Sequence, residues 1–501
     1  MSFIRKIKKK DGIYLAEVES KWIDGKVVQK HIRYIGKEVD NKTILSSSIS
    51  NIQIEDVKIY GPILVLNYIS KKINLNKILG EYGNEILCLV FAHCINYKSI
   101  NQMSAWFKRT DLNVLLKINN LTERKLLQAL DSLEAFDAVK LQQKIFNSVR
   151  KEYQIKPEGI IYDVTNTYLY GKKCPFGKMG HDKEGVKGRP LIQIGLGVTK
   201  DEGIPIFHKT FDGNIHDTKT LHDLISSFGY YGIQRGIVIY DRGITSAQNV
   251  ADIGKLQWNS LCGVPLKGNL KSFIRKMKTN KNIMDIKNRV KMKKSIFYVI
   301  QEQYTIGKIT GTLVLCFNEQ QRKDLRESRY DEIINAQNIL KRGKCIKQRL
   351  EKYFDKECEI IEKKLKEAEE FDGYSCIFTT ASLSKEEIIS LYFRQKDLVE
   401  KAFRTMKGIT SLRPIRHWLY NRVTAHVFIC YLAYLLLSLL NLHLKKLNIS
   451  PELALREIDS MYKVYMHDVE KGFEISRVVT LSKKQNQILN AISRTLTKPS
   501  V

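Results

Sequence analysis

The chain has 501 residues, 43% of them hydrophobic, so it can bury the cores of two to four domains and is not a wholly disordered protein. Its 83 basic against 53 acidic residues give a formal net charge of +30, which predicts a polyanionic partner, nucleic acid above all. Nine scattered cysteines without a C-x-x-C pair exclude a disulfide framework and predict a reducing, cytoplasmic location and no structural zinc. The basic N-terminus is not followed by an apolar stretch, so we expect no signal peptide.

The first third of the chain is predicted to change from strands to helices. Residues 1–55 are β-rich, because the segments 14–20 and 26–35 flank an Asp-Gly turn at 24–25, which is typical of a hairpin. Residues 56–155 are mostly helical, with apolar residues at helical spacing over 63–73, 84–95 and 121–149. This helical region is either a helix-turn-helix reader of DNA or a plain packing module, and the sequence leaves both open.

Residues 156–266 are predicted to form an α/β core. Strands are expected at 160–170, 190–199, 204–211, 236–241 and 260–266, with helices at 218–228 and 246–256. Three consecutive strands followed by helical crossovers predict a mixed sheet with helices on both faces. The Gly-rich loop at 171–189 lacks the residue order of a nucleotide-phosphate loop, so we do not expect nucleotide binding there.

The core pattern stops near residue 267 and returns near 371. Residues 267–370 are predicted to be a basic insertion: 267–294 carry eleven basic residues and a single acid, and strands follow at 295–302 and 310–318, then helices over 331–370. Residues 371–445 resume the core with a strand at 374–380 and a helix whose start carries Ser384 and Glu387 in a capping-box arrangement. The apolar run 427–442 favours a buried core helix over a membrane span. Residues 446–501 are expected to be a helical C-terminal region and a candidate oligomer contact.

Three acids stand out as a candidate catalytic set. Two short apolar runs each lead to an acid at or near their end: Ile-Ile-Tyr at 160–162 precedes Asp163, and Val-Ile-Tyr at 238–240 precedes Asp241. Asp163 lies inside its strand, where a buried acid is unfavourable unless it is paired or binds a metal ion. Glu400 lies on the helix 385–407 beside its apolar stripe, with Lys396 and Arg404 four residues away on either side. Three hard oxygen ligands suit two Mg²⁺ or Mn²⁺ ions, which activate a nucleophile and stabilise a leaving oxygen in phosphodiester chemistry.

Other polar residues have simpler interpretations. Asp217 is the main competitor for the second acid, but it precedes a predicted helix, so N-terminal capping is its simpler role. Four histidines lack a tight ligand spacing and are interpreted as structural or DNA-facing: His181, His208, His216 and His417.

The helix 385–407 resembles a signature of bacterial insertion-sequence transposases of the insertion-sequence-four superfamily, Y-x2-R-x3-E-x6-K. Glu400 and Lys407 match it in register, whereas Phe393 and Lys396 stand where it has Tyr and Arg, and Tyr392 lies one residue out of register. Further blocks in the same order are similar to the family: Gly-His-Asp-Lys-Glu at 180–184, Arg-Pro at 189–190, Phe-Asp-Gly-Asn at 211–214, Asp-Gly at 372–373 and Leu-Arg-Pro-Ile-x-His at 412–417.

The resemblance implies a ribonuclease H-like mixed sheet flanked by helices, interrupted by a β-containing insertion, with an N-terminal β-hairpin and a helical region that binds the transposon ends. It implies Asp163, Asp241 and Glu400 as the catalytic and metal-binding acids, with Mg²⁺ or Mn²⁺ as cofactor. The implied reaction is cleavage at the element ends followed by attack of the freed 3′ hydroxyl on target DNA. The expected partners are double-stranded DNA, at the terminal inverted repeats and at the target, and a second copy of the chain in the DNA complex, without a membrane. The expected DNA contacts are Lys396, Arg404, Lys407, Arg242, Lys183, Arg189 and Arg413.

Two other functions stay open. A ribonuclease H-like nuclease or resolvase would cut DNA without joining a 3′ end to a target. A non-catalytic DNA-binding relative would not cut at all. Some relatives use an aromatic residue to hold a flipped base beside a DNA hairpin, but residues 267–370 contain no Trp.

Overall fold

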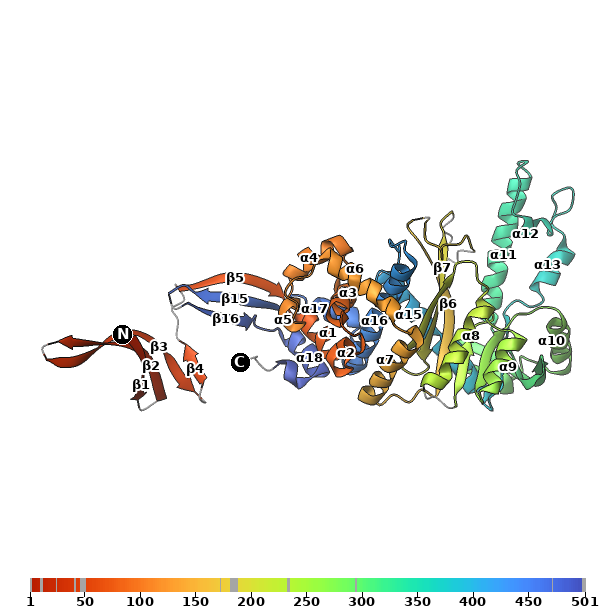
Figure 1. The fold of residues 1–501 in the computed structure, drawn as a ribbon. Coiled ribbons are helices and arrows are strands. Elements are labelled where there is room, and N and C mark those ends of the chain that lie inside the picture. Colours follow the sequence, from red (N-terminus) through yellow and green to blue (C-terminus); the bar gives the residue numbers. More distant parts are fainter. Residues whose placement is uncertain are drawn as a thin grey trace.

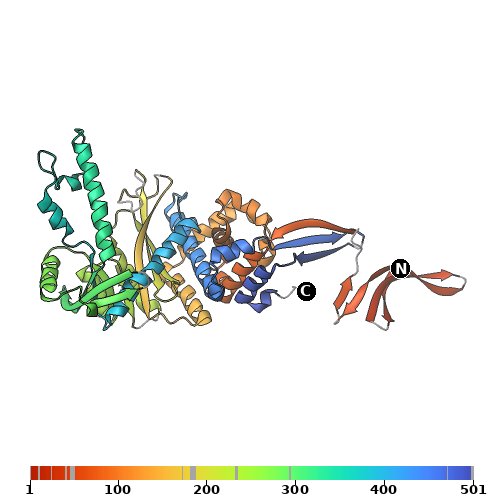
Figure 2. The same ribbon diagram turned by 180° about the vertical axis from the view of Figure 1, so that it is seen from behind.

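The computed structural model describes residues 2–9, 12–23, 25–39, 42–45, 51–171, 173–180, 188–231, 235–292, 295–470 and 472–497. The molecule is elongated, with the N-terminal sheet at one end, a helical body in the middle and a large sheet with its insertion at the other end (Figure 1). The view from behind shows the same order (Figure 2).

The large sheet has nine strands in the order β11-β12-β13-β14-β10-β9-β6-β7-β8. Its first part is an antiparallel meander followed by two parallel strands: β6 (Gly159–Tyr168), β7 (Leu191–Thr199), β8 (Pro205–Asp212), β9 (Ile237–Tyr240) and β10 (Asn259–Val264). The order β8-β7-β6-β9-β10 is the ribonuclease H-like arrangement, so the predicted mixed sheet is confirmed. β6 and β9 are parallel neighbours in its middle.

The insertion extends this sheet. Its strands β11 (Arg289–Met292), β12 (Ser295–Ile306) and β13 (Ile309–Phe317) pair in sequence, and β13 pairs with the returning strand β14 (Tyr374–Thr379). Its helices are α10 (Asn269–Asn280), the 22-residue α11 (Glu319–Leu340), α12 (Gln348–Glu351) and α13 (Glu362–Glu369). The insertion therefore shares hydrogen bonds with the core through β13 and β14.

Helices cover both faces of the sheet. α8 (Asp217–Ser227) and α9 (Ala247–Lys255) pack on one face, over a core that includes Tyr162 and Tyr240. On the other face lie α14 (Lys385–Ile389), the π-helical segment η5 (Ser390–Gln395), α15 (Lys396–Gly408) and α16 (Tyr420–Leu444). The predicted capping box of Ser384 and Glu387 at α14 is confirmed. α16 is long and apolar enough to cross a membrane, but 94% of its most apolar window is buried in the protein, in agreement with a core helix.

A helical body packs against α16. It contains α1 (Gly61–Lys72), α2 (Leu75–Ile78), α3 (Gly83–Ile95), α4 (Ile100–Lys108), α5 (Leu112–Leu115), α6 (Glu123–Ser132) and α7 (Ala138–Tyr153), in agreement with the predicted helical region. From the C-terminal part, α17 (Pro451–Glu457) and α18 (Lys483–Ile492) join it. Between these two helices lie two strands that the sequence analysis did not anticipate, β15 (Tyr462–Asp468) and β16 (Phe473–Val478).

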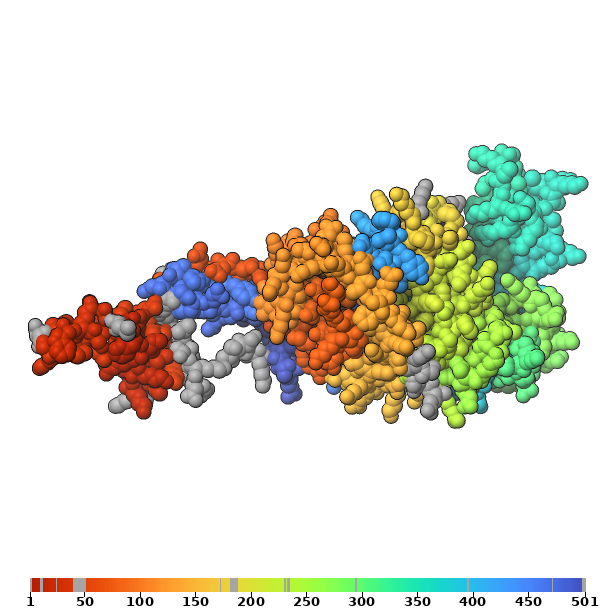
Figure 3. Space-filling model, in the orientation of Figure 1, coloured from red at the N-terminus to blue at the C-terminus, as the bar shows by residue number. Residues whose placement is uncertain are grey.

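Two smaller sheets lie beyond the helical body. β15 pairs with both β16 and β5 (Ile52–Ile59), and this three-stranded arm projects away from the helices (Figure 3). The second sheet joins β1 (Ser2–Lys9), β2 (Gly12–Ile23), β3 (Lys26–Val39) and β4 (Lys42–Leu45) in antiparallel order. The predicted hairpin corresponds to β2 and β3, and Trp22 close to its turn is 73% exposed.

Candidate active site

Two of the three predicted acids belong to the neighbouring parallel strands β6 and β9, with Asp163 inside β6 and Asp241 directly after β9. The paired residues of β6 and β9 run from Gly159 and Ile237 to Tyr162 and Tyr240, so Asp163 and Asp241 come next on each strand. Because side chains alternate along a strand, Asp163 faces away from buried Tyr162 and lies on the side of the sheet that carries α15. α15 packs across β6 on this side. The prediction that strand β6 continues beyond Asp163, which leaves the acid inside a strand, is confirmed.

The third acid reaches Asp241 through a shared lysine. Glu400 is on α15, and Lys396 lies one turn before it. The Lys396 Nζ atom is 3.0 Å from Asp241 Oδ2 and 3.7 Å from Glu400 Oε1. One ammonium group therefore bridges a carboxylate at the end of a strand and a carboxylate on the helix above it. Asp241 and Glu400 therefore face the same positive charge, the ammonium group of Lys396.

A tyrosine holds the other oxygen of Asp241. The Tyr392 hydroxyl donates to Asp241 Oδ1 at 3.2 Å, and the backbone N–H of Arg242 donates to the same atom at 2.7 Å. Burial raises the pKa of the phenol, with a further rise from the Asp241 charge, so Tyr392 stays a hydroxyl donor. Burial acts to raise the pKa of Asp241, but Lys396, the Arg242 N–H and Tyr392 together hold that pKa below its usual value. Asp241 is thus kept ionised.

The π-helical turn explains why Tyr392 and not Phe393 reaches this acid. A π-helix closes its hydrogen bonds over five residues, so it contains one residue more per turn than an α-helix. The segment Ser390–Gln395 directly precedes Lys396, and it places Tyr392 on the side of the acids. Phe393, at the signature's Tyr position, instead stacks on Phe297 of the insertion, with ring centroids 4.8 Å apart. The sequence gives one sign of this extra residue in the helix: Tyr392 stands one position before the place where the signature has its Tyr.

These groups line a cleft of about 930 Å³ between the core and the insertion. On the core side, the sheet contributes Asp241, Arg242 and Gly263 to the wall of the cleft. The helical segments η5 and α15 contribute Tyr392, Lys396 and Glu400. The insertion contributes Met292 and Ser295 near β12, and Gln321 and Leu325 from α11. Asp163 does not line this cleft, and its place beside Asp241 comes from the strand register. The contribution of α11 was not predicted.

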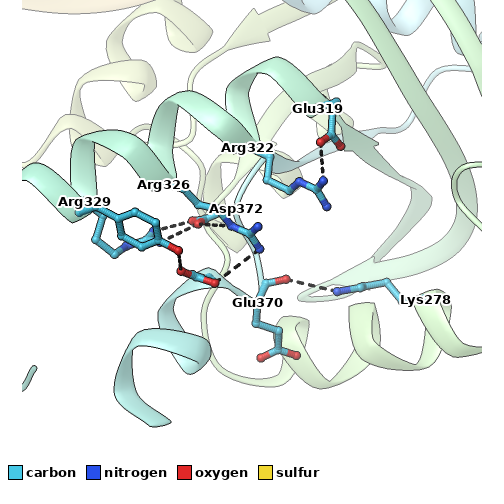
Figure 4. A network of polar contacts seen from close by, with 9 residues as sticks. Lys278, Glu319, Arg322, Arg326, Arg329, Glu370 and Asp372 are labelled. Carbon is cyan, nitrogen blue, oxygen red and sulfur yellow. Dashed lines mark hydrogen bonds and ion pairs between the residues drawn. The ribbon is translucent and has the colours of Figure 1, made fainter. Parts of the chain in front are cut away.

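A network of ion pairs fixes α11 to the residues just before β14 (Figure 4). Arg329 of α11 donates two parallel hydrogen bonds to Asp372, at 2.6 and 2.5 Å, and Asp372 is only 5% exposed. Arg275 of α10 binds Glu370 in the same bidentate way, with two contacts of 2.7 Å. Bidentate Arg–carboxylate pairs fix orientation as well as distance. The network therefore holds the wall that α11 gives to the cleft.

The predicted DNA-contacting residues fall into two groups. Lys396 and Arg242 line the cleft, and Arg404 is exposed two turns beyond Lys396 on α15, with half-buried Lys407 further along. The others lie near the far end of β6. The Arg189 guanidinium lies over the ring of Tyr168, the last residue of β6. Leu169, the next residue, forms an isolated bridge with Ile415 of the segment that carries Arg413. Lys183 lies outside the described residues.

The structure corrects the interpretation of Asp217 and places the histidines. α8 begins at Asp217 itself and His216 is the N-cap residue, so Asp217 belongs to the first helical turn and is not the cap. His208 is buried, and its ring nitrogen lies 2.9 Å from Gln142 Oε1 in a structural contact. His417 is partly buried beside His426. His181 lies outside the described residues.

The strand order places the chain among ribonuclease H-like α/β proteins. The family model described as Transposase DDE domain matches residues 154–436, which is more than half of the chain, so the chain belongs to this family. Its class is therefore that of the DDE transposases. Among solved structures, the piggyBac transposase synaptic complex with hairpin DNA, determined by cryo-EM, is similar with 10% identity, 80% of each chain covered and a TM-score of 0.40. No curated protein sequence matches the chain.

Proposed function

We propose that the chain is the transposase of a bacterial insertion sequence of the insertion-sequence-four superfamily. In this proposal it cleaves DNA at the ends of its element and joins the freed 3′ ends to target DNA. Asp163, Asp241 and Glu400 are the proposed catalytic acids and ligands of Mg²⁺ or Mn²⁺. The membership of residues 154–436 in the Transposase DDE domain family supports the reaction class.

One observation carries the assignment of Asp241 and Glu400: the Lys396 ammonium lies between them, at 3.0 and 3.7 Å. Asp163 joins the proposed set through the pairing of β6 with β9. This shared cationic partner supports the proposal that the two carboxylates can face one positive charge. The donor set around it consists of hard oxygen atoms, which suits Mg²⁺ or Mn²⁺. Bound there, divalent ions would supply activation of the attacking oxygen and stabilisation of the leaving oxygen.

The other residues of the cleft have roles that do not depend on the ions. Tyr392 and the Arg242 N–H fix one oxygen of Asp241 and leave the second to Lys396. Lys396 can exchange its carboxylate partners for a DNA phosphate, and the Arg242 side chain at the rim is exposed to meet the same backbone. α11 forms one wall of the cleft with Gln321 and Leu325.

The surroundings of the cleft support DNA as the substrate. The formal net charge of +30 favours binding to a phosphate backbone. We infer that Arg404, Lys407, Arg189 and Arg413 continue the phosphate contacts beyond the cleft. We further propose that the helical body binds the inverted repeats, that two copies assemble on DNA through residues 446–501, and that the protein is cytoplasmic and associated with DNA.

A joining assay separates this proposal from its two alternatives. Labelled DNA that carries the element ends is incubated with the full chain, a supercoiled plasmid target and Mg²⁺ or Mn²⁺. The proposal expects end cleavage and covalent transfer of the labelled 3′ end to the plasmid. Cleavage without transfer would identify a nuclease or resolvase, and binding without cleavage a non-catalytic relative. Asp241→Asn is the negative control, and Asp217→Asn is its matched partner outside the proposed acid set.

A further inference from the structure

A second cluster of possible metal ligands lies inside the protein, away from the DDE acids. His93 of α3 and His426 and Cys430 of α16 are buried, and their three ligand atoms all lie within 4.8 Å of one another. His426 and Cys430 are four residues apart, so they stand one above the other on the same helix face. No sequence motif links them to His93, which is more than 300 residues away, and this is why the cysteine spacing predicted no zinc site.

The geometry points to a structural zinc site, and we propose that His93, His426 and Cys430 bind one Zn²⁺ ion. Cys430 Sγ is 3.6 Å from His93 Nδ1 and 3.8 Å from His426 Nε2. Zn–S and Zn–N bonds of roughly 2.3 and 2.05 Å in a tetrahedron place sulfur and nitrogen about 3.6 Å apart, close to both distances. One thiolate and two imidazoles are a donor set that favours Zn²⁺ over Mg²⁺.

The Thr410 carbonyl belongs to the hydrogen bonding of this cluster. Its oxygen is 2.5 Å from His93 Nδ1 and accepts a hydrogen bond from Cys430 Sγ at 3.4 Å. Nitrogen and oxygen ligands of one tetrahedral zinc ion lie roughly 3.4 Å apart, so this oxygen is a partner of the ligands and not itself a ligand, and zinc binding would replace the two hydrogen bonds. A cavity of about 20 Å³ adjoins His93 and His426 and has His417 in its wall, which is room for a water molecule as the fourth ligand. The site is closed and buried, as structural zinc sites are.

The protonation of the cluster is compatible with metal binding. Burial lowers the pKa of His93 to about 4 and the pKa of His426 well below its usual value, so both imidazoles are neutral. Burial raises the pKa of the Cys430 thiol to about 12 without a metal ion. On binding, the S–H bond breaks, its proton leaves to solvent, and the sulfur electron pair forms the bond to Zn²⁺ without any redox change.

The site would join two parts of the chain. His93 comes from the helical body, and Cys430 and His426 from the core helix α16. Thr410 follows the end of α15, the helix that carries Glu400, and its hydroxyl donates to Met406 O within that helix end. Zinc at this point would hold α3 of the helical body against α16, beside the end of the Glu400 helix, so we assign the ion a structural role.

The test measures zinc in the full chain with Asp163→Asn, Asp241→Asn and Glu400→Gln, so that the proposed catalytic acids cannot contribute. After dialysis against a weak chelator, mass spectrometry is expected to find about one zinc per chain. Cobalt reconstitution is expected to give a tetrahedral d–d band and a thiolate-to-cobalt charge-transfer band. Cys430→Ser in this background is expected to lose both bands. Cys94→Ser is the control, because Cys94 is buried beside His93 but donates to Ala433 O.

Two results would overturn the proposal. One is a folded chain that retains no zinc and gives no charge-transfer band with cobalt. The other is equal metal retention by the Cys430→Ser and Cys94→Ser variants. If Cys430→Ser does not fold, the thiolate-to-cobalt charge-transfer band of the background protein decides the question, since only a cysteine ligand gives this band.

Discussion

Replacing Gly263 by Ala tests how Asp241 is positioned, because this glycine leaves the space that Tyr392 occupies. A Cβ atom at Gly263 would overlap the Tyr392 hydroxyl and lie 3.1 Å from Tyr392 Cζ and 3.2 Å from Arg242 Cβ. To regain van der Waals separation the phenol oxygen must move by about 1 Å. That shift breaks its 3.2 Å hydrogen bond to Asp241. A misplacement of this size is expected to slow DNA cleavage by roughly 10- to 100-fold, and the overpacking to destabilise the fold by about 1–2 kcal/mol.

The assay is single-turnover cleavage of end DNA with Mg²⁺, combined with urea unfolding of each variant. Gly254→Ala is the matched control, because its nearest neighbour is 4.0 Å from the added Cβ, and it is expected to cleave at the wild-type rate. Tyr392→Phe removes the hydroxyl, so adding Gly263→Ala in that background is expected to slow cleavage much less than it does in the wild type. Equal losses in both backgrounds would refute the reasoning, since the added methyl group would then not act through the phenol.

Three further outcomes are expected. Asp372→Asn removes the buried carboxylate that pairs with the partly buried Arg329, and it is expected to lower the free energy of unfolding by about 3 kcal/mol in urea titrations. A loss below about 0.5 kcal/mol would mean that the pair does not hold α11. Burial lowers the pKa of His208 to about 3, so below pH 6.5 the unfolded chain binds a proton that the folded chain does not, and stability falls as the pH falls. At pH 5 the loss from this residue is about 2 kcal/mol, and His208→Gln is expected to flatten the pH profile of unfolding. Arg404→Gln is expected to weaken DNA binding at all sequences. It is expected to reduce the slope of the logarithm of the DNA-binding constant against the logarithm of the salt concentration by about 0.9, for one lost phosphate contact. Lys401→Gln is the control: Lys401 pairs with Asp397, and its replacement is expected to leave the slope unchanged.

The core could be predicted because its signals are local. Apolar runs bounded by turn residues predicted the strands that lead to Asp163 and Asp241. The capping pair of Ser384 and Glu387 predicted where the helical segment that leads to Glu400 begins. Each of these signals depends on neighbouring residues, and the strand order then follows from the meander and the crossovers.

The features that could not be predicted depend on contacts between distant segments. The π-helical turn that selects Tyr392 over Phe393 adds one residue inside an otherwise ordinary helical pattern. The pairing of β13 with β14 makes the insertion part of the core sheet, and no local pattern encodes that pairing. The approach of His93 to Cys430 likewise brings together residues that are 337 positions apart in the sequence.

The most direct test of the account is the rate of metal-dependent cleavage of end DNA by four carboxylate variants. Asp163→Asn, Asp241→Asn and Glu400→Gln are expected to reduce cleavage by roughly a thousandfold or more, because each removes a charged oxygen ligand of the proposed ions. Asp217→Asn is expected to cleave within a few-fold of wild type. Wild-type cleavage by any of the first three variants, or a loss in Asp217→Asn as large as theirs, would contradict the assignment of the catalytic acids.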